Sequence, residues 1–333
     1  MSLKIGIVGL PNVGKSTLFN ALTKKSVLAA NYPFATIDPN VGIVPVPDER
    51  LTKLSEFSKS EKTIPAVIEF VDIAGLVAGA SKGEGLGNKF LSHIREVDAI
   101  LEMVRTFEDK DIVHVANKVD PLSDIAVINY ELILADLDVV MKRTETNGRD
   151  YKRGDKEAVL LQGVLEKLRT ALENEQMASS VSFDEKELPL VHQLNLLTMK
   201  PILYALNISA ANENRAAEVA AKVPGAYVEI DPVFETGFDR LITAAYELLG
   251  LETYFTTGAD ETRAWTIKKG STAPIAGTAI HTDFKEKFIR AEVVYWSDLL
   301  DAGSYAEARS RGKVRTEGKE YIIKDGDVIE FRI

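Results

Sequence analysis

One short segment near the N-terminus restricts the fold of this chain more than any other. The apolar run Leu3–Val8 leads directly into Gly9-Leu10-Pro11-Asn12-Val13-Gly14-Lys15-Ser16, and the helix-forming segment Thr17–Thr23 follows. The glycines let several backbone N–H groups face one anion, Lys15 can reach the β- and γ-phosphates, and Ser16 can hold Mg²⁺. The positive end of the helix dipole points at the same place. This order of strand, loop and helix predicts a nucleotide-phosphate site, and a chance match in an ordinary strand-to-helix turn is the alternative.

Composition narrows the class of protein. The 333 residues are too many for one core, and their 45% hydrophobic and 27% charged residues are typical of a soluble globular protein. Because no apolar stretch approaches the ~20 residues that span a bilayer, we expect a cytoplasmic protein with no membrane partner. The chain has no cysteine, which excludes disulfides and thiolate metal sites. Its net charge of -10 means that any RNA contact must come from a local patch.

Apolar strands alternate with helical segments on both sides of the middle of the chain. We expect strands over 66–71 and 99–105, with a helix over 88–97 between them, and the same pattern returns with a strand over 201–207. Such alternation predicts a doubly wound, mostly parallel α/β sheet, the fold class of the P-loop NTPases.

A helical segment interrupts this pattern. Apolar residues recur at three- and four-residue spacings over 123–147 and again over 156–176, and a polar stretch, 144–150, lies between. Two amphipathic helices joined by a polar turn predict an antiparallel hairpin inserted into the nucleotide domain. Its apolar stripe serves either self-packing or contact with a partner.

The last part of the chain has the pattern of a small α+β module. Short strands are expected over 262–267, 288–295, 321–323 and 328–331, with a tight turn at 324–327 between the last two. The predicted division is therefore a nucleotide-binding domain over 1–122 and 198–254, the hairpin over 123–197, and a C-terminal domain over 255–333.

Three oxygen-bearing side chains are candidates for a Mg²⁺ site. Asp72 ends the predicted strand 66–71, as the metal-assisting Asp does in phosphoryl-transfer enzymes with this loop, and Ser16 lies in the loop itself. Thr36 comes from the segment between them and can complete the shell. Gly75 is placed to sense the γ-phosphate through its backbone, and a passive linker is the alternative for the glycine-rich stretch after it.

The usual water-positioning residue is missing. Leu76 stands where Ras-like proteins carry a glutamine, and a leucine cannot orient water. His114 follows the strand 99–105 and is the candidate replacement, so Lys15 and His114 are the predicted catalytic residues. A lone histidine in an apolar run is also often a packed core residue.

Two segments compete for the role of base reader. Asn117-Lys118-Val119-Asp120 matches the guanine motif, but only about a dozen residues separate it from the strand 99–105. A parallel crossover needs at least about ten to twelve residues for its helix and turns, and the segment 107–111 is not typical of a helix. We therefore interpret it as a coincidence. The better candidate is Asn207-Ile208-Ser209-Ala210, where Ala210 offers guanine no acceptor. Asn207 and Ile208 are the expected base contacts, and adenine is tolerated or preferred.

With these motifs the chain resembles the YchF-type Obg-like ATPases, a branch of the translation-factor-related P-loop proteins. The resemblance covers nearly the whole chain. Its motifs are Gly9–Ser16, Asn31–Asn40, Asp72–Val77, Gly83–Leu91, Thr262–Thr266, Ile280–Phe284 and Phe288–Ala291.

The resemblance implies ATP preferred over GTP, a helical coiled-coil insertion, a C-terminal TGS domain with a ubiquitin-like β-grasp, and association with the ribosome. It also implies that leucine at position 76 is a family trait and that His114 is the family's proposed catalytic histidine. Asn12 matches an asparagine that helps to hold K⁺ in related proteins. The nucleotide-binding residues expected from the motifs are Asn12, Val13, Gly14, Lys15, Ser16, Thr17, Gly75, Asn207 and Ile208.

This sequence departs from the family pattern at two places. The base-reading motif of the family usually ends in Glu, where this chain has Ala210. The stretch 227–237 is shorter than the family's, and the family's base-contacting loop cannot be located in it.

Three functions remain open. The first is an ATPase switch that acts with the ribosome, and the second is a GTPase that reads guanine through Asn117–Asp120. The third is a nucleotide-regulated RNA- or ribosome-binding module whose turnover is incidental. Basic residues near the C-terminus motivate the third: Lys285, Lys287, Arg290, Arg309, Arg311, Lys313 and Arg315.

Overall fold

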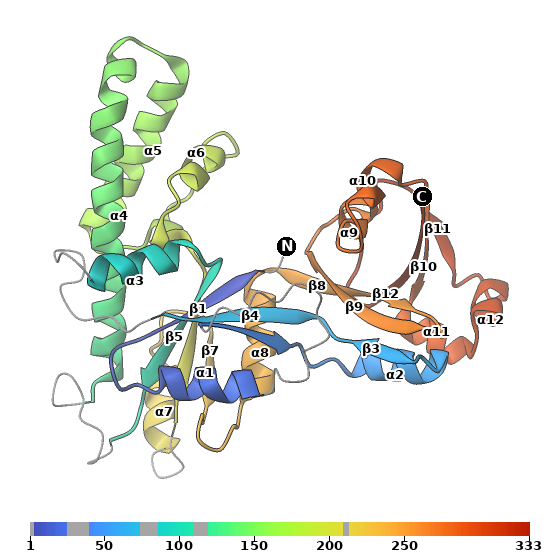
Figure 1. Ribbon diagram of the computed structural model, residues 1–333. Helices are drawn as coiled ribbons and strands as arrows, with labels where there is room; N and C mark the ends of the chain where they lie inside the picture. Colours follow the sequence, from blue (N-terminus) through green and yellow to red (C-terminus); the bar gives the residue numbers. More distant parts are fainter. Residues whose placement is uncertain (1–2, 25–39, 74–85, 109–118, 209–212) are drawn as a thin grey trace.

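Six strands from the first two-thirds of the chain form one largely parallel sheet (Figure 1). The structure is a computed structural model, and it describes residues 3–24, 40–73, 86–108, 119–208 and 213–333. The strands, in sheet order, are β2 (Val41–Pro45), β4 (Val67–Asp72), β1 (Lys4–Val8), β5 (Ala99–Arg105), β6 (Ile202–Asn207) and β7 (Tyr227–Ile230). β2 runs antiparallel to β4, and the other pairs are parallel. The predicted doubly wound fold is confirmed.

Helices cover this sheet because its central strands are apolar on both faces. Every residue of β5 is buried, as expected for a strand inside a parallel sheet. On one face, Ile125 packs with Val104 and Leu206 of the strands. The helices of this part are α1 (Lys15–Lys24), α3 (Leu86–Arg95), α4 (Pro121–Lys152), α7 (Glu213–Ala220) and α8 (Phe238–Leu248).

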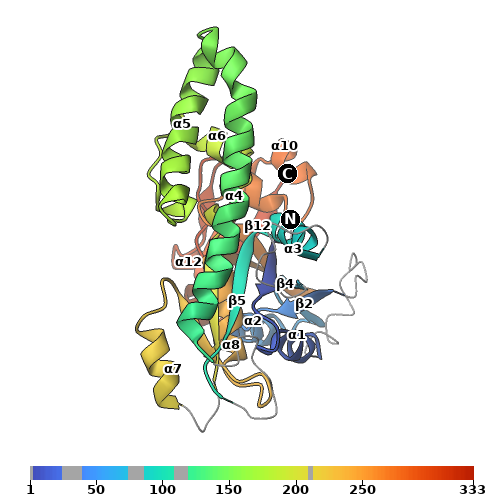
Figure 2. The same cartoon turned by 90° about the vertical axis from the view of Figure 1, so that its left-hand side faces the viewer.

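The helical hairpin rises from the sheet as a separate arm (Figure 2). It consists of α4 and α5 (Lys156–Glu173), with the short α6 (Leu188–Gln193) against them, and it has a hydrophobic cluster of its own. The polar stretch 144–150, predicted as the turn, is helical. The reason lies at Asn147, whose Nδ2 donates across the hairpin to the carbonyl of Ala158 (2.9 Å). This hydrogen bond takes the place of the apolar contact between helices that a hydrophobic periodicity would indicate.

A second sheet of six strands forms the other end of the molecule. Its order is β11 (Arg315–Glu317), β10 (Arg290–Tyr295), β12 (Asp327–Arg332), β8 (Leu251–Thr257), β9 (Glu261–Lys268) and β3 (Lys62–Ile64). The predicted strand 321–323 is wrong: Ile322 makes only an isolated bridge to Thr272. β10 and β8 pair with the two edges of β12, so the segment 321–323 has no free edge of β12 to pair with. Short helices α9 (Ala273–Gly277), α10 (Asp283–Lys287), α11 (Trp296–Ala302) and α12 (Tyr305–Ser310) complete this part.

One segment from the first half of the chain belongs spatially to this second sheet. β3 pairs in parallel with β9, and α2 (Glu49–Ser58) contacts β8 and β9 (Figure 1). Ser60 strengthens the link, because its Oγ donates to the carbonyl of Gly258 (2.7 Å). The chain therefore passes between the two sheets at three places: before α2, between β3 and β4, and after α8. Among the described helices, none is long and apolar enough to span a bilayer.

Candidate functional site

The phosphate loop lies between β1 and α1 and packs directly on neighbouring strands. Gly14 has φ = 103°, and a Cβ there would lie 2.7 Å from Nδ2 of Asn207. A Cβ on Gly9 would lie 2.7 Å from the carbonyl oxygen of Met103. Both positions need glycine, because backbone direction and space each exclude a side chain. Asn12, with φ = 63°, gives the loop another left-handed residue.

Lys15 is folded into the curl of this loop. Its Nζ donates to the carbonyls of Gly9 (3.0 Å) and Leu10 (2.8 Å), and the side chain is buried. Burial lowers the pKa of Lys15 to about 8, although the carboxylate of Asp72 partly offsets this. The ammonium group is thus held where phosphate oxygens would arrive, and their negative charge would favour its protonated form.

The fold brings the predicted metal ligands Ser16 and Asp72 together. Asp72 ends β4, the neighbour of β1, and the Ser16 hydroxyl donates to its Oδ2 at 3.5 Å. Burial raises the pKa of Asp72, and Lys15 and Ser16 counteract that shift. Two hard oxygens next to a phosphate loop fit Mg²⁺, which takes one or two protein oxygens and fills its shell with phosphate and water. Thr36, Gly75, Leu76 and His114 lie outside the described residues.

A cavity of about 400 Å³ continues from the phosphate loop along the carboxyl ends of β5, β6 and β7. Sequence reasoning predicted six of its lining residues: Asn12, Val13, Gly14, Thr17, Asn207 and Ile208. It missed Phe107 and the segment 231–234. The missed residues follow directly after strands β5 and β7, and ligands of doubly wound sheets bind at this edge, so strand ends were the signal that could have found them.

Asn207 braces the loop. Its Nδ2 donates to the carbonyl of Val13 (2.9 Å), and its own carbonyl accepts from the hydroxyl (2.8 Å) and the N–H (3.1 Å) of Thr106. The side chain is buried. The side-chain amide of Asn207 therefore fixes the position of the phosphate loop, and the same residue also lines the cavity.

Asp120, the last residue of the guanine-like motif, caps a helix. Its Oδ1 accepts from the N–H of Ser123 (3.3 Å) at the start of α4, and the residue is exposed. It does not line the described cavity. This role supports the interpretation of Asn117–Asp120 as a coincidental match, although Asn117, Lys118 and Ala210 lie outside the described residues.

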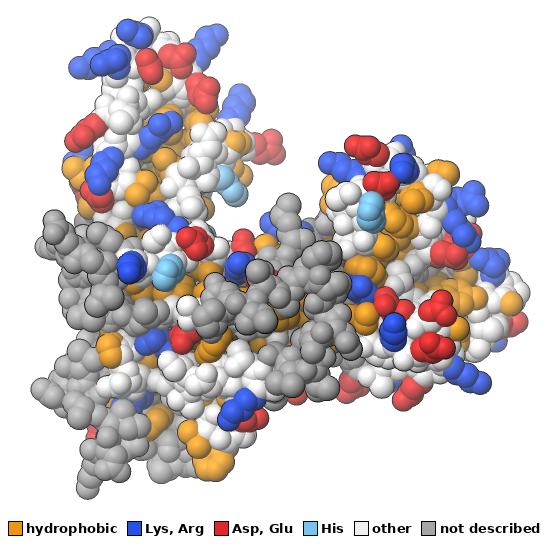
Figure 3. Space-filling model, in the orientation of Figure 1, with side chains coloured by type: hydrophobic (Ala, Val, Ile, Leu, Met, Phe, Trp, Pro, Cys, Tyr) orange, Lys and Arg blue, Asp and Glu red, His pale blue; other side chains and the backbone are white. Residues whose placement is uncertain are grey.

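Most of the basic residues on which the hypothesis of RNA binding rests form ion pairs with acidic side chains. Arg309 pairs with Glu292, Arg311 with Glu307 (2.7 Å) and Lys313 with Asp298 (3.0 Å). Lys287 and Arg315 also have acidic partners. Figure 3 shows basic and acidic side chains interspersed on the visible face of this part of the molecule. A uniformly positive patch for RNA is therefore absent from that described face.

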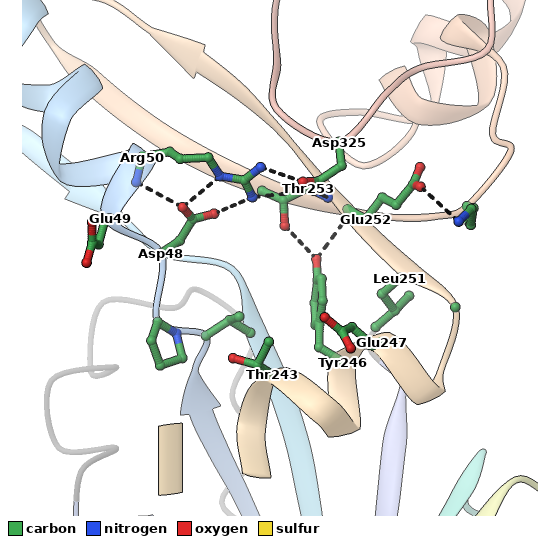
Figure 4. Close-up of a pocket in the computed structure, with 14 residues that line it drawn as sticks. Asp48, Glu49, Arg50, Thr243, Tyr246, Glu247, Leu251, Glu252, Thr253 and Asp325 are labelled. Atoms are coloured by element: carbon green, nitrogen blue, oxygen red, sulfur yellow. Dashed lines mark hydrogen bonds and ion pairs between the residues drawn. The ribbon is translucent and has the colours of Figure 1, made fainter. Parts of the chain in front are cut away.

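A larger cavity, of about 700 Å³, lies between the two sheets (Figure 4). Arg50, Tyr246, Thr253 and Asp325 are among its lining residues, and Arg50 pairs with both Asp48 and Asp325. It contains no residue of the phosphate loop. Size alone therefore does not identify the nucleotide site.

The phosphate loop between β1 and α1, with Lys15 in its curl and Asp72 at the end of the adjacent strand, defines a P-loop NTPase. A family model described as a 50S ribosome-binding GTPase matches residues 4–161. A model of the YchF GTPase C-terminal domain, described as a protein of unknown function, matches residues 251–333.

Full-length relatives identify the family more closely. The "Ribosome-binding ATPase YchF" of Bacillus subtilis is 53% identical over 363 residues, covering 100% of this chain and 99% of the relative. That of Escherichia coli O157:H7 is 47% identical, covering 99% of each. The structure titled a YchF GTPase from Schizosaccharomyces pombe superposes with a TM-score of 0.90 at 38% identity, covering 99% of this chain and 98% of the other. The chain belongs to the YchF family.

The alignment with the Bacillus subtilis relative also bears on chain length. It is 30 positions longer than the 333 residues of this chain. This chain therefore lacks residues that its relative has.

Proposed function

We propose that this chain is an ATP-hydrolysing switch that binds the ribosome, as the names of its relatives state for those proteins. The observation that carries the proposal is the convergence of Lys15, Ser16 and Asp72 on one phosphate loop in a chain 53% identical to a ribosome-binding ATPase. We further propose a cytoplasmic location and the division into domains 1–122 with 198–254, 123–197, and a TGS-like 255–333.

Different residues have different roles in the proposed hydrolysis of ATP. Lys15 and the loop N–H groups neutralise charge that develops on the transferred phosphoryl group. Ser16 and Asp72, with Thr36, would hold Mg²⁺, which neutralises phosphate charge when bound. Gly75 would sense the γ-phosphate and His114 would position the attacking water. Asn12 is the proposed contributor to a K⁺ site.

Dissociation constants for Mg-ATP and Mg-GTP test the choice of nucleotide. We expect ATP to bind at least as tightly as GTP, because Asp120 is used as a helix cap. A GTP constant tenfold or more below that for ATP would instead establish the alternative, a GTPase reading guanine through Asn117–Asp120. The lysine variant Lys15→Ala should lose both nucleotides.

Co-sedimentation with ribosomes tests the switch. Binding should differ between a non-hydrolysable ATP analogue and ADP, and Lys15→Ala should abolish the difference. Binding that ignores the nucleotide would support the third hypothesis, a module with incidental turnover. Removal of residues 255–333 then shows whether the C-terminal domain supplies an RNA contact.

A further inference from the structure

The free end of the helical arm carries a group of basic side chains. α4 has 32 residues and, at 1.5 Å per residue, is about 48 Å long, so its last residues lie far from the sheet (Figure 1). The end of the arm, residues 142–157, is called the arm tip below. It contains six basic and four acidic residues, whereas the whole chain has a net charge of -10. The arm tip is therefore a positively charged end on a negatively charged protein, and Figure 3 shows basic side chains there.

Most of these basic side chains have no acidic partner. Lys142 pairs with Asp138 (2.6 Å), and Arg153 pairs with Asp150 (3.5 Å). The other four are exposed and form no ion pair within the part of the chain that the structure describes: Arg143, Arg149, Lys152 and Lys156. In the C-terminal domain, by contrast, most basic residues are paired. The arm tip thus offers cations to a ligand outside the chain.

The acidic residues of the arm tip do not neutralise these cations. Asp150 is engaged with Arg153, and Oδ1 of Asp155 accepts from a backbone N–H at the start of α5 (2.9 Å), where it caps the helix. Glu145 and Glu157 are exposed and form no ion pair with any described residue. The positive charge of the arm tip therefore stays open to solvent.

The cations are closely spaced, and an aromatic ring lies among them. Arg149 and Lys152 are three residues apart on α4, so their Cβ atoms lie about 5–6 Å apart on one face of the helix. Tyr151 comes between them in sequence and has 44% of its surface exposed. Lys156 begins α5, on the other side of the turn that contains Gly154 (φ = 77°). Three cations and one ring are therefore held on a rigid helical support.

This chemistry fits the backbone of RNA. Clustered basic residues are the electrostatic footprint of a nucleic-acid contact, and exposed aromatic rings can stack on bases. A nucleic-acid strand presents an unbroken row of phosphates, whereas a folded acidic protein presents scattered carboxylates. Because the rest of the protein is acidic, repulsion restricts an RNA contact to this end of the arm.

The identity of the RNA follows from the proposed ribosome binding, on which this inference rests. We propose that the arm tip contacts ribosomal RNA, with Arg149, Lys152 and Lys156 binding its phosphates. The contact depends on charge and not on base sequence, since phosphate contacts position a protein without reading sequence. It should therefore weaken steeply with salt.

The test measures binding of the full chain to purified ribosomes by co-sedimentation and to a short labelled RNA duplex by fluorescence anisotropy, at several salt concentrations. Arg149→Ala with Lys152→Ala should weaken both by about tenfold. It should also lower the slope of log affinity against log salt by about 2, because each lost phosphate contact lowers it by about 1. The charge-keeping pair, Arg149→Lys with Lys152→Arg, should retain binding.

A matched control removes two cations elsewhere. Lys222 and Lys319 are also exposed and form no ion pair within the described residues. Lys222→Ala with Lys319→Ala should bind ribosomes and the RNA duplex as the unaltered chain does. All the variants should bind ATP normally, because none of these side chains lines the described nucleotide cavity.

Three results would overturn the inference and leave ATP binding and the nucleotide-dependent switch intact. In the first, the alanine pair at the arm tip binds ribosomes within twofold of the unaltered chain. In the second, the control pair loses as much affinity as the arm-tip pair. In the third, the arm-tip pair loses ribosomes but keeps the RNA duplex, which would indicate an acidic protein as the partner. If the unaltered chain does not bind ribosomes, the proposed function fails together with this inference.

Discussion

The guanidinium of Arg50 bridges two carboxylates, those of Asp48 and Asp325, which come from opposite ends of the sequence (Figure 4). Arg50 is the second residue of α2, and Asp325 lies in the turn before β12, where its Oδ1 also accepts from the N–H of Thr253 (2.9 Å). Nη2 of Arg50 lies 3.4 Å from that same oxygen. The pair thus attaches a segment of the first half of the chain to the C-terminal sheet.

A double-mutant cycle measures this attachment. Arg50→Ala and Asp325→Ala should show a coupling of about 1 kcal/mol in the free energy of unfolding by urea, since the pair is charge-assisted but partly exposed. The coupling should fall as salt is added. The cycle on Lys313 and Asp298, an ordinary surface pair at 3.0 Å, is the control and should give close to zero. Equal coupling in the two cycles contradicts a special role for Arg50.

Nucleotide binding should take up a proton near pH 8. Burial lowers the pKa of free Lys15 to about 8, and bound phosphates favour the charged ammonium, so the pKa rises on binding. Affinity should therefore fall as pH rises above 8, in a range where phosphate itself, with its last pKa at about 6, no longer titrates. Calorimetry at pH 8.5 in buffers of different ionisation enthalpy counts the protons. Lys15→Arg, which stays charged, should remove the proton uptake. If the unaltered chain takes up no proton when the nucleotide binds, this prediction is wrong.

Glu102 should make the protein less stable as pH rises. It lies in β5 with 1% exposure, and neither carboxylate oxygen has a hydrogen-bond partner in the described structure. Burial, and next the nearby Asp124, raises its pKa well above the ordinary value. Because the pKa of Glu102 is higher in the folded than in the unfolded protein, its effect on the free energy of unfolding depends on pH. The free energy of unfolding is highest below the unfolded pKa of about 4.3, and it declines from there up to the folded pKa.

Replacement of Glu102 by glutamine tests this. Relative to the unaltered chain, Glu102→Gln should gain up to about 1.4 kcal/mol of unfolding free energy for each pH unit above the unfolded pKa of about 4.3, until the folded pKa is reached. Urea titrations at several pH values measure the difference. Glu145→Gln, on the exposed side of α4, should show no such trend. A pH-independent difference for Glu102→Gln would mean that Glu102 ionises at its ordinary pH in the folded protein.

Loss of the Asn207 brace should weaken nucleotide binding specifically. Asn207→Ala removes the hydrogen bond to Val13, at a cost of about 1 to 2 kcal/mol in binding, or roughly five- to thirtyfold in the dissociation constant for ATP. Asn147→Ala is a matched control, because Asn147 is also buried and also donates 2.9 Å to a backbone carbonyl, but within the hairpin. The control should lose stability without losing affinity. If both variants keep the affinity, the brace does not set the loop geometry.

Sequence patterns predicted those parts of the fold whose determinants lie within a few residues. The strand 99–105 was predicted with the bounds that β5 has, and the phosphate loop lies between β1 and α1 as expected. The metal pair followed from one more step, because parallel neighbouring strands bring Ser16 and Asp72 to the same edge. Thr36, Gly75 and His114 stay predictions.

The errors have a common cause. The stretch 144–150 was predicted as a turn because its residues are polar, yet Asn147 finds its partner across the hairpin. The segment 321–323 has strand-forming residues, yet β8 and β10 already flank β12. In both cases a contact distant in sequence overrode a local preference.

The sequence by itself determined that this chain holds phosphates, because a phosphate loop is built from consecutive backbone groups whose geometry local residues dictate. Tertiary structure decided the rest of the site. The Asn207 amide braces the loop, the turn with Val233 and Phe234 forms the far wall of the cavity, and α2 with β3 packs on the C-terminal sheet. These arrangements depend on which strands become neighbours, and strand order follows from packing the whole chain.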